Sequence, residues 1–231
     1  MSNINYEKIN NNTIGKQSNA QTNMMSFLQS TYQLFAGSLL AAAAGAFVGL
    51  GMTSVIASWF WGFIILEFTL LFGIFAVKKI PGVNLIVLFL FTFVSGLTLA
   101  PLLSAIFSMD GGSSIVAQAF LMTSVAFGGI STFAMTTKRD YSSMEKMLFI
   151  TLIIVVIASI SNIFFQSPIF QVAISGVSAI LFSAYILYDT QQIVNGNYET
   201  PIEASISLYL DFLNLFISLL QLLGIFNSSD D

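Results

Sequence analysis

Seven long apolar runs dominate the sequence, and each is close to the roughly 20 residues that a helix needs to cross the hydrocarbon core of a bilayer. The composition fits such a chain, because 56% of the 231 residues are hydrophobic and only 8% are charged, whereas soluble domains carry about 25% charged residues. We therefore predict an all-α integral membrane protein with seven transmembrane helices. The predicted spans are residues 33–52, 59–77, 83–107, 115–136, 147–165, 169–192 and 204–224.

The domain organisation follows from the polar segments between and beyond these runs. No charge separates the fifth run from the sixth, but residues 166–168 (Gln-Ser-Pro) form a polar, helix-ending break. Residues 1–30 are rich in Asn, Gln, Ser and Thr, and we expect a mobile polar tail rather than a signal peptide. Residues 31–226 form the predicted transmembrane domain, and residues 227–231 form a short acidic C-terminal tail.

The basic residues predict the orientation of the chain. All of them fall on one side when seven spans alternate, and cytoplasmic loops are the ones enriched in Lys and Arg. They are Lys8, Lys16, Lys78, Lys79, Lys138, Arg139 and Lys146. We therefore expect the N-terminus in the cytoplasm and a periplasmic or extracellular C-terminus.

Two aspartates, Asp189 and Asp211, lie inside the sixth and seventh predicted spans. An ionised carboxylate in hydrocarbon costs several kcal/mol unless it is neutralised, hydrated or paired, so each is a candidate functional residue. They lie at equal sequence distance from Thr200 in the intervening turn, and an antiparallel helix pair would hold them at similar depth. Two close carboxylates tend to share a proton, which gives a chain without His a pH sensor; when both are ionised they could bind calcium transiently.

A polar stripe that includes Asp211 follows one face of the seventh predicted helix. Its members recur at spacings of four, three, four and three residues, which places them on one face. They are Ser207, Asp211, Asn214, Ser218 and Gln221. Hydrogen bonding between helices is the simpler interpretation for Ser207, Ser218 and Gln221. We interpret the aspartates as functional and Asn214 as a candidate for an ion pathway.

Two further charged residues, Glu67 and Lys78, belong to the second predicted helix and its end. Glu67 lies near mid-membrane without a partner that the sequence identifies, and it is either protonated and structural or part of an ion pathway. Lys78 ends the second helix on the side where Asp189 ends the sixth, so a salt bridge between them is geometrically allowed. A simple role as an anchor at the membrane surface is the alternative for Lys78.

The composition also argues against several kinds of chemistry. Without Cys or His the chain lacks disulfides, thiolate chemistry and the commonest transition-metal ligands, and its basic residues are too few for a nucleic-acid patch. We expect no cofactor, and the lipid bilayer as the first partner. An intramembrane aspartyl protease also uses two Asp on adjacent helices, but Tyr188 and Leu210, rather than Gly, precede the two aspartates. We therefore do not expect an enzyme.

Four segments resemble the Bax inhibitor-1 family, also called the transmembrane Bax-inhibitor-motif or LifeGuard family. The most specific are AYILYDTQQIV (184–194) and SLYLDFLNLFISLLQLLG (207–224), in this order and with this spacing. The other two are FTFVSGLTLAPLLS (91–104) and TTKRDYSSM (136–144), so the likeness covers roughly residues 25–226.

The resemblance implies a fold and a function. Bacterial members are inner-membrane proteins that act as pH-sensitive calcium leak channels, with six helices around a central C-terminal seventh helix. The family's di-aspartyl pH sensor falls on Asp189 and Asp211, and the position of an Arg that latches onto the first aspartate is occupied here by Lys78, which lacks the bidentate fork. Glu67 matches a second-helix Glu of bacterial relatives. Some relatives instead bind and restrain a membrane-embedded, ATP-dependent quality-control protease, and this regulatory role is the alternative function.

Overall fold

The computed structural model describes residues 3–227, with side chains from residue 22 onwards, as helices joined by short connections. Seven helices in this part of the chain are long and apolar enough to cross a membrane, as the sequence predicts. The elements are α1 (Asn3–Leu50), α2 (Thr53–Ser58), α3 (Phe60–Val77), α4 (Val83–Phe107), α5 (Gly112–Thr136), the 3-10 helix η1 (Ser142–Met144), α6 (Glu145–Phe165), α7 (Pro168–Val194) and α8 (Pro201–Asn227). Most of the expected acidic tail, residues 228–231, lies outside the described residues.

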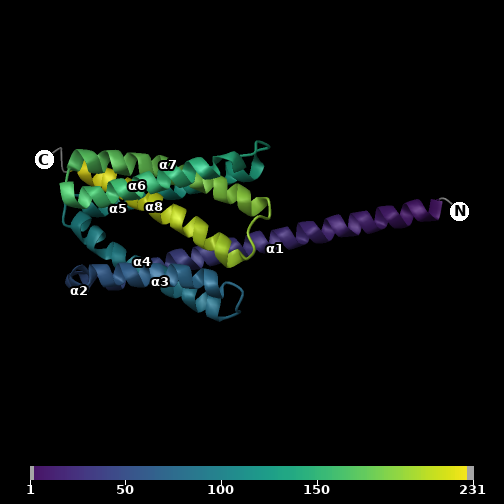
Figure 1. The fold of residues 1–231 in the computed structure, drawn as a ribbon, viewed down its shortest axis with the longest axis horizontal. Helices are drawn as coiled ribbons and strands as arrows, with labels where there is room; N and C mark the ends of the chain where they lie inside the picture. The colour runs from purple at the N-terminus through teal and green to yellow at the C-terminus, as the bar shows by residue number, and fades with distance from the viewer. Residues whose placement is uncertain (1–2, 228–231) are drawn as a thin grey trace.

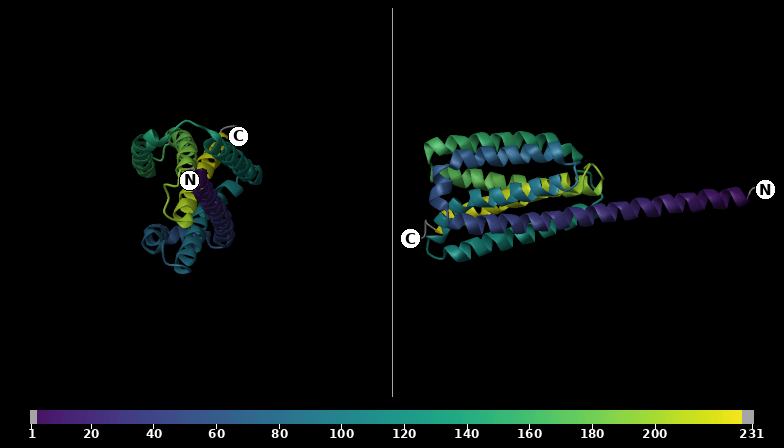
Figure 2. Two further views of the ribbon diagram at one scale, coloured as in Figure 1. Left: turned by 90° about the vertical axis from the view of Figure 1, so that its right-hand side faces the viewer. Right: turned by 90° about the horizontal axis from the view of Figure 1, so that it is seen from below.

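Helix α1 is much longer than the first predicted span, and its N-terminal part projects from the bundle (Figures 1 and 2). The part apolar enough to cross a membrane is Thr22–Leu50. The preceding residues continue the same helix back to Asn3, so no break in the backbone marks the expected boundary at residue 31. The mobility of residues 1–30 stays a prediction.

The boundary between α6 and α7 falls at the predicted polar break. Gln166 ends α6 in the left-handed region (φ 49°), and its backbone N–H donates to the carbonyl of Asn162 at 2.8 Å. The Ser167 hydroxyl then caps α7 by accepting from the N–H of Phe170 at 3.3 Å, and Pro168 occupies the first turn, where no N–H is required. Local chemistry thus divides a stretch that hydropathy alone would join.

Helix α8 is the most buried span of the bundle. It packs against α7, α5, α1 and α4 and runs obliquely between them (Figure 1). Its Tyr209, Phe212 and Leu215 belong to the main hydrophobic cluster, together with Phe35 of α1 and Phe127 of α5. The arrangement of six helices around α8 stays a prediction, because α3 and α6 make their main contacts with α4 and α7.

Helices α1 and α4 approach each other closely at two glycines. A Cβ atom added to Gly45 would lie 2.0 Å from the carbonyl oxygen of Phe93, and one added to Gly96 would lie 2.0 Å from that of Ala42. Small residues of this kind let two backbones touch, which is how many spans associate in lipid, where the hydrophobic effect supplies little force between helices.

Replacing Gly45 by Ala should destabilise the bundle by about 1–3 kcal/mol, because the backbone of α4 would have to move away. Thermal unfolding in detergent, followed by circular dichroism, measures the effect. Gly128→Ala is the matched control, since nothing lies within 4 Å of a Cβ atom at Gly128. Equal melting temperatures for the two variants would show that the close contact contributes nothing.

Candidate functional site

The two intramembrane aspartates meet where α7 packs against α8. Asp189 belongs to the last two turns of α7 and Asp211 to the N-terminal half of α8, and they are only 8% and 4% exposed. Their carboxyl groups lie within hydrogen-bonding reach of each other, as the sequence predicts. An ionised carboxylate only accepts hydrogen bonds, so two such groups in contact must share a proton or hold a cation.

One oxygen of this pair is still open to a proton or a cation. Oδ2 of Asp211 is buried and has no hydrogen-bond partner among the described residues. Leaving a charged oxygen in that state costs more than leaving a neutral carboxyl oxygen. An unpartnered carboxyl oxygen of Asp211 therefore lies in the buried contact between α7 and α8.

A tyrosine in the connection between α7 and α8 completes the polar surroundings of the pair. The hydroxyl of Tyr198 lies close to Asp189 and to Ser207 in the polar stripe. Burial and the neighbouring Asp189 raise the pKa of Tyr198, so the hydroxyl stays protonated and can donate to the carboxylate. Tyr198 is not among the residues that the sequence predicts for the site; the signal for it is an aromatic residue in an otherwise polar turn between two Asp-bearing helices.

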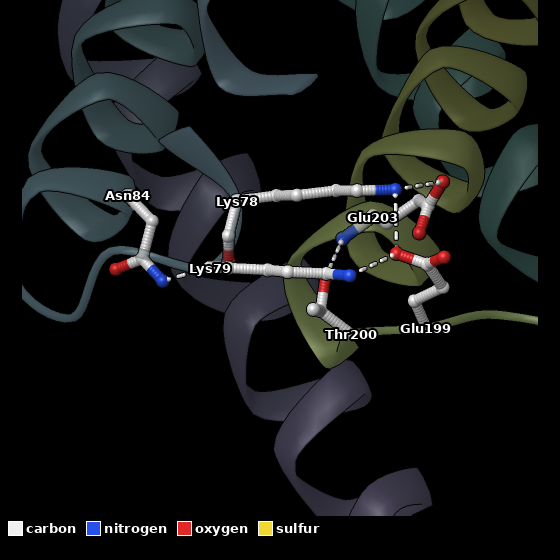
Figure 3. Close-up of polar contacts among 6 residues, drawn as sticks. All are labelled: Lys78, Lys79, Asn84, Glu199, Thr200 and Glu203. Carbon is white, nitrogen blue, oxygen red and sulfur yellow. Dashed lines mark hydrogen bonds and ion pairs between the residues drawn. The ribbon is translucent and has the colours of Figure 1, made fainter. Parts of the chain in front are cut away.

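Lys78 pairs with glutamates and not with Asp189. Its ammonium group lies 3.1 Å from a carboxylate oxygen of Glu203 and 3.1 Å from one of Glu199, and Lys79 lies 3.0 Å from Glu199 (Figure 3). Hydrogen bonds donated to Glu203 and Glu199 raise the pKa of Lys78. The expected Lys78–Asp189 salt bridge is absent, because the end of α3 lies beside the first turn of α8 and the connection before it (Figure 3).

Neighbouring hydrogen bonds fix both sides of this charge cluster. The side chain of Asn84 donates to the carbonyl of Lys78 at 3.1 Å and accepts from the N–H of Leu85 at 2.8 Å. The hydroxyl of Thr200 accepts from the N–H of Glu203 at 3.2 Å, which caps the start of α8 (Figure 3). The ends of α3 and α8 are therefore held in a defined position relative to each other.

Glu67 has a partner that the sequence did not identify. It lies half-buried on α3 and accepts a hydrogen bond from the hydroxyl of Thr98 on α4 at 3.0 Å. Ser95, one turn before Thr98, is hydrogen-bonded to Tyr209 of α8. Glu67 thus belongs to a polar contact among α3, α4 and α8 that is separate from the aspartate pair. This contact favours the structural interpretation of Glu67, and its role in an ion pathway stays a prediction.

The rest of the α8 stripe is hydrogen-bonded within the protein. Asn214 donates to the carbonyl of Leu210 at 2.7 Å, and Ser218 donates to the carbonyl of Asn214 at 2.6 Å, both within α8. Gln221 accepts hydrogen bonds from two residues of α7, each at 2.9 Å. Interhelical hydrogen bonding is thus confirmed for Gln221, whereas Ser218 bonds within its own helix. The place of Asn214 in an ion pathway stays a prediction.

The described residues hold no group of three or more His, Cys, Asp or Glu side chains that could bind a metal ion. The aspartate pair supplies fewer oxygen ligands than the six to eight that calcium takes. A calcium ion at Asp189 and Asp211 would therefore have to keep part of its water.

These observations define a class of protein: a seven-helix membrane protein whose last two helices bury a pair of neighbouring aspartates. A family model described as "Inhibitor of apoptosis-promoting Bax1" matches residues 24–228. The chain belongs to the Bax inhibitor-1 family.

Bacterial relatives match most of the chain. It is 54% identical over 209 residues to an uncharacterized protein of Campylobacter jejuni, and the aligned part covers 87% of this chain and 89% of the relative. It is 50% identical over 210 residues to an uncharacterized protein of Helicobacter pylori strain J99, which covers 91% of each. It is also 36% identical over 136 residues to the modulator of FtsH protease YccA of Escherichia coli strain K12, which covers 59% of this chain and 62% of that protein.

Neutralising Glu199 should destabilise the folded protein slightly at neutral pH and not in acid. Hydrogen bonds from Lys79 and Lys78 lower the pKa of Glu199 from its ordinary 4.5. Its contribution is therefore present above pH 4.5 and lost as the pH falls through the lowered pKa. We expect Glu199→Gln to lower the melting temperature by about 1–2 °C at pH 7 and by nothing measurable at a pH well below the lowered pKa of Glu199.

The matched control is Asp110→Asn, which removes an exposed acid that forms no ion pair among the described residues. Its melting temperature should follow the wild type at both pH values. A loss of stability in Glu199→Gln that persists unchanged in acid would contradict the electrostatic explanation.

Proposed function

We propose that the protein is a pH-sensitive passive calcium leak channel of the bacterial inner membrane, gated by Asp189 and Asp211. The observation that carries this proposal is the burial of two carboxyl groups within hydrogen-bonding reach of each other between α7 and α8. A pair that served only as a scaffold could use Asn, which hydrogen-bonds without the cost of a buried charge. The resemblance to calcium-leak members of the family supports the same assignment.

The proposed gate depends on the proton that the pair shares. With one proton, the two carboxyl groups bind each other and hold α7 against α8. Loss of that proton leaves two like charges, which repel each other unless a cation lies between them. Binding of a second proton removes the ionised carboxylate that accepts the hydrogen bond. Either change shifts the balance between closed and open packings, for which a few kcal/mol suffice. The ionised pair also offers the oxygen ligands that calcium prefers.

Lys78 is the proposed latch next to the gate. Through its ion pairs with Glu203 and Glu199, it connects α3 to the hairpin that carries both aspartates. We place this latch on the cytoplasmic side with the N-terminus, and the C-terminus on the periplasmic or extracellular side. Glu67 and Asn214 are the proposed further contributors to the ion pathway.

Asp189→Asn and Asp211→Asn should each flatten the pH dependence of calcium flux, because neither variant retains two carboxyl groups that share a proton. Flux is measured with purified protein in liposomes that contain a calcium-sensitive dye. Between about pH 5 and 8 we expect flux through the wild type to change about tenfold, and flux through each variant to change at most about twofold.

The control for this experiment is Asp140→Asn, which removes a carboxylate from the connection after α5 and leaves the intramembrane pair intact. It should keep the wild-type pH profile. If both Asp189→Asn and Asp211→Asn also kept that profile, the assignment of the pH sensor would be wrong.

A second candidate function is regulation of a membrane-embedded, ATP-dependent quality-control protease. The observation that favours it is the Escherichia coli relative that is named as a modulator of the FtsH protease. The N-terminal part of α1 projects from the bundle, which makes it the proposed contact for such a partner (Figure 1).

If the regulatory role is the main one, deletion of residues 1–25 should abolish co-purification of the protease and leave calcium flux within about twofold of the wild type, because the span that remains is still long enough to cross the bilayer. Asp211→Asn serves as the converse control, with the protease complex retained. Retention of the complex by the truncated chain would contradict a role for this segment.

A further inference from the structure

The end of the α7–α8 pair away from the aspartates holds an uncharged polar network that joins three helices. The amide of Asn162 on α6 donates to Gln171 on α7 at 2.8 Å, and the amide of Gln171 donates to Gln221 on α8 at 2.9 Å and to Ser175 at 3.2 Å. The hydroxyl of Ser175 also donates to Gln221 at 2.9 Å. We call these four residues the carboxamide network.

A cavity of about 530 Å³ lies against this network, between α4, α7 and α8. Gln171 and Gln221 form its polar side, and Ile106 of α4 and Met109 of the following connection contribute apolar walls. Gly224 also lines the cavity, and a Cβ atom there would lie 2.5 Å from Cδ1 of Ile106, so α4 and α8 are in close contact at this wall. Gln221 is thus the member of the polar stripe that borders the cavity, and Ser218 and Asn214 lie further along α8.

The hydrogen bonds of the network occupy the oxygen that an entering cation would need. A carboxamide oxygen has two lone pairs, and Oε1 of Gln221 already accepts from both Gln171 and Ser175. Beyond it, Ser218 and Asn214 donate to backbone carbonyls of their own helix. We therefore expect a cation in the cavity to pass Gln221 towards Ser218 only when these hydrogen bonds break and α7 separates from α8.

We propose that this cavity is an entrance of the ion pathway and that the carboxamide network is a barrier at its inner side, distinct from the aspartate pair. The members of the network carry no titratable group, and Asp110, in the nearby connection between α4 and α5, is exposed. The barrier therefore contains no group that titrates. The identity of the transported ion rests on the proposed function, whereas the barrier itself does not.

The absence of Cys from the natural chain allows a direct test by thiol accessibility. Single cysteines are introduced by Ile225→Cys, which lies in the cavity wall, and by Ser218→Cys, which lies beyond the network on the stripe. The protein is placed in nanodiscs at one pH, and the rate of modification by a membrane-impermeant trimethylammonium methanethiosulfonate is measured. We expect Ile225→Cys to react at least about tenfold faster than Ser218→Cys, because only the second thiol is behind hydrogen bonds that must break.

Gln221→Leu, which keeps the side-chain size but removes the acceptor, should increase the modification rate of Ser218→Cys about tenfold and leave that of Ile225→Cys unchanged. Gln118→Leu is the matched control, because Gln118 is exposed on α5 and hydrogen-bonded to Ser114 of the same helix. Gln171→Leu removes the donor of the hydrogen bond between Gln171 and Gln221 and should have the same effect as Gln221→Leu. If one of the two variants fails to fold, the other still tests the barrier. A rate at Ser218→Cys that is equal to that at Ile225→Cys in the wild-type background, or that is unchanged by both substitutions, would overturn the barrier.

Calcium flux distinguishes a failure of this inference from a failure of the proposed function. In liposomes, Gln221→Leu should raise calcium flux about tenfold at the pH values where the aspartate contact is open, without moving the midpoint of the pH profile. If neither the wild type nor this variant carries calcium, the proposed function fails, and the thiol rates still decide whether the network is a barrier.

Discussion

The packing of α7 against α8 is the interaction on which the polar interior of this protein depends. A polar group that faces hydrocarbon costs several kcal/mol, so the polar side chains of these two helices must face each other, other helices or water. This requirement constrains the rotation of both helices. Asp189 and Asp211 meet at one end of the pair, and Gln171 and Gln221 meet at the other. The opposite side of α8 then presents Phe212 to the aromatic residues of α1 and α5.

Near the connection between α7 and α8, the lysine–glutamate ion pairs and the two aspartates differ in how much they can contribute to the free energy of the bundle. The ion pairs of Lys78 and Lys79 involve partly or largely exposed side chains, and such pairs are weakened by water and salt. Their main effect is to position the end of α3 against the start of α8. The aspartates are buried, so a change of their protonation acts in a medium of low dielectric constant and has a much larger effect on free energy. A pH response of the bundle is therefore expected from the aspartates, with the lysines restraining the hairpin that carries them.

The sequence predicts these features to different extents, for physical reasons. The number of spans and the break at residues 166–168 depend on hydropathy and helix capping, which are local properties. The contact between Asp189 and Asp211 follows from their positions around one turn. The partners of Lys78 and Glu67 depend instead on which helices are neighbours and how each is rotated. Apart from Glu67 and Thr69, helix α3 is apolar, so no periodic pattern in its sequence fixes that rotation.

The contacts at Asp211 and Gln221 lie on one face of α8, and this determines how an ion pathway along that helix could open. Two barriers in series pass ions only when both are open, so a pH-sensitive contact at Asp211 would control flux poorly if the contact at Gln221 opened independently. The two residues lie ten positions apart, about 15 Å along a single uninterrupted helix. A rigid helix transmits a displacement over that distance without loss. Movement of α8 away from α7 that starts with repulsion between the carboxylates therefore also strains the hydrogen bonds of Gln221, and this mechanical connection would let a titrating contact control an uncharged one.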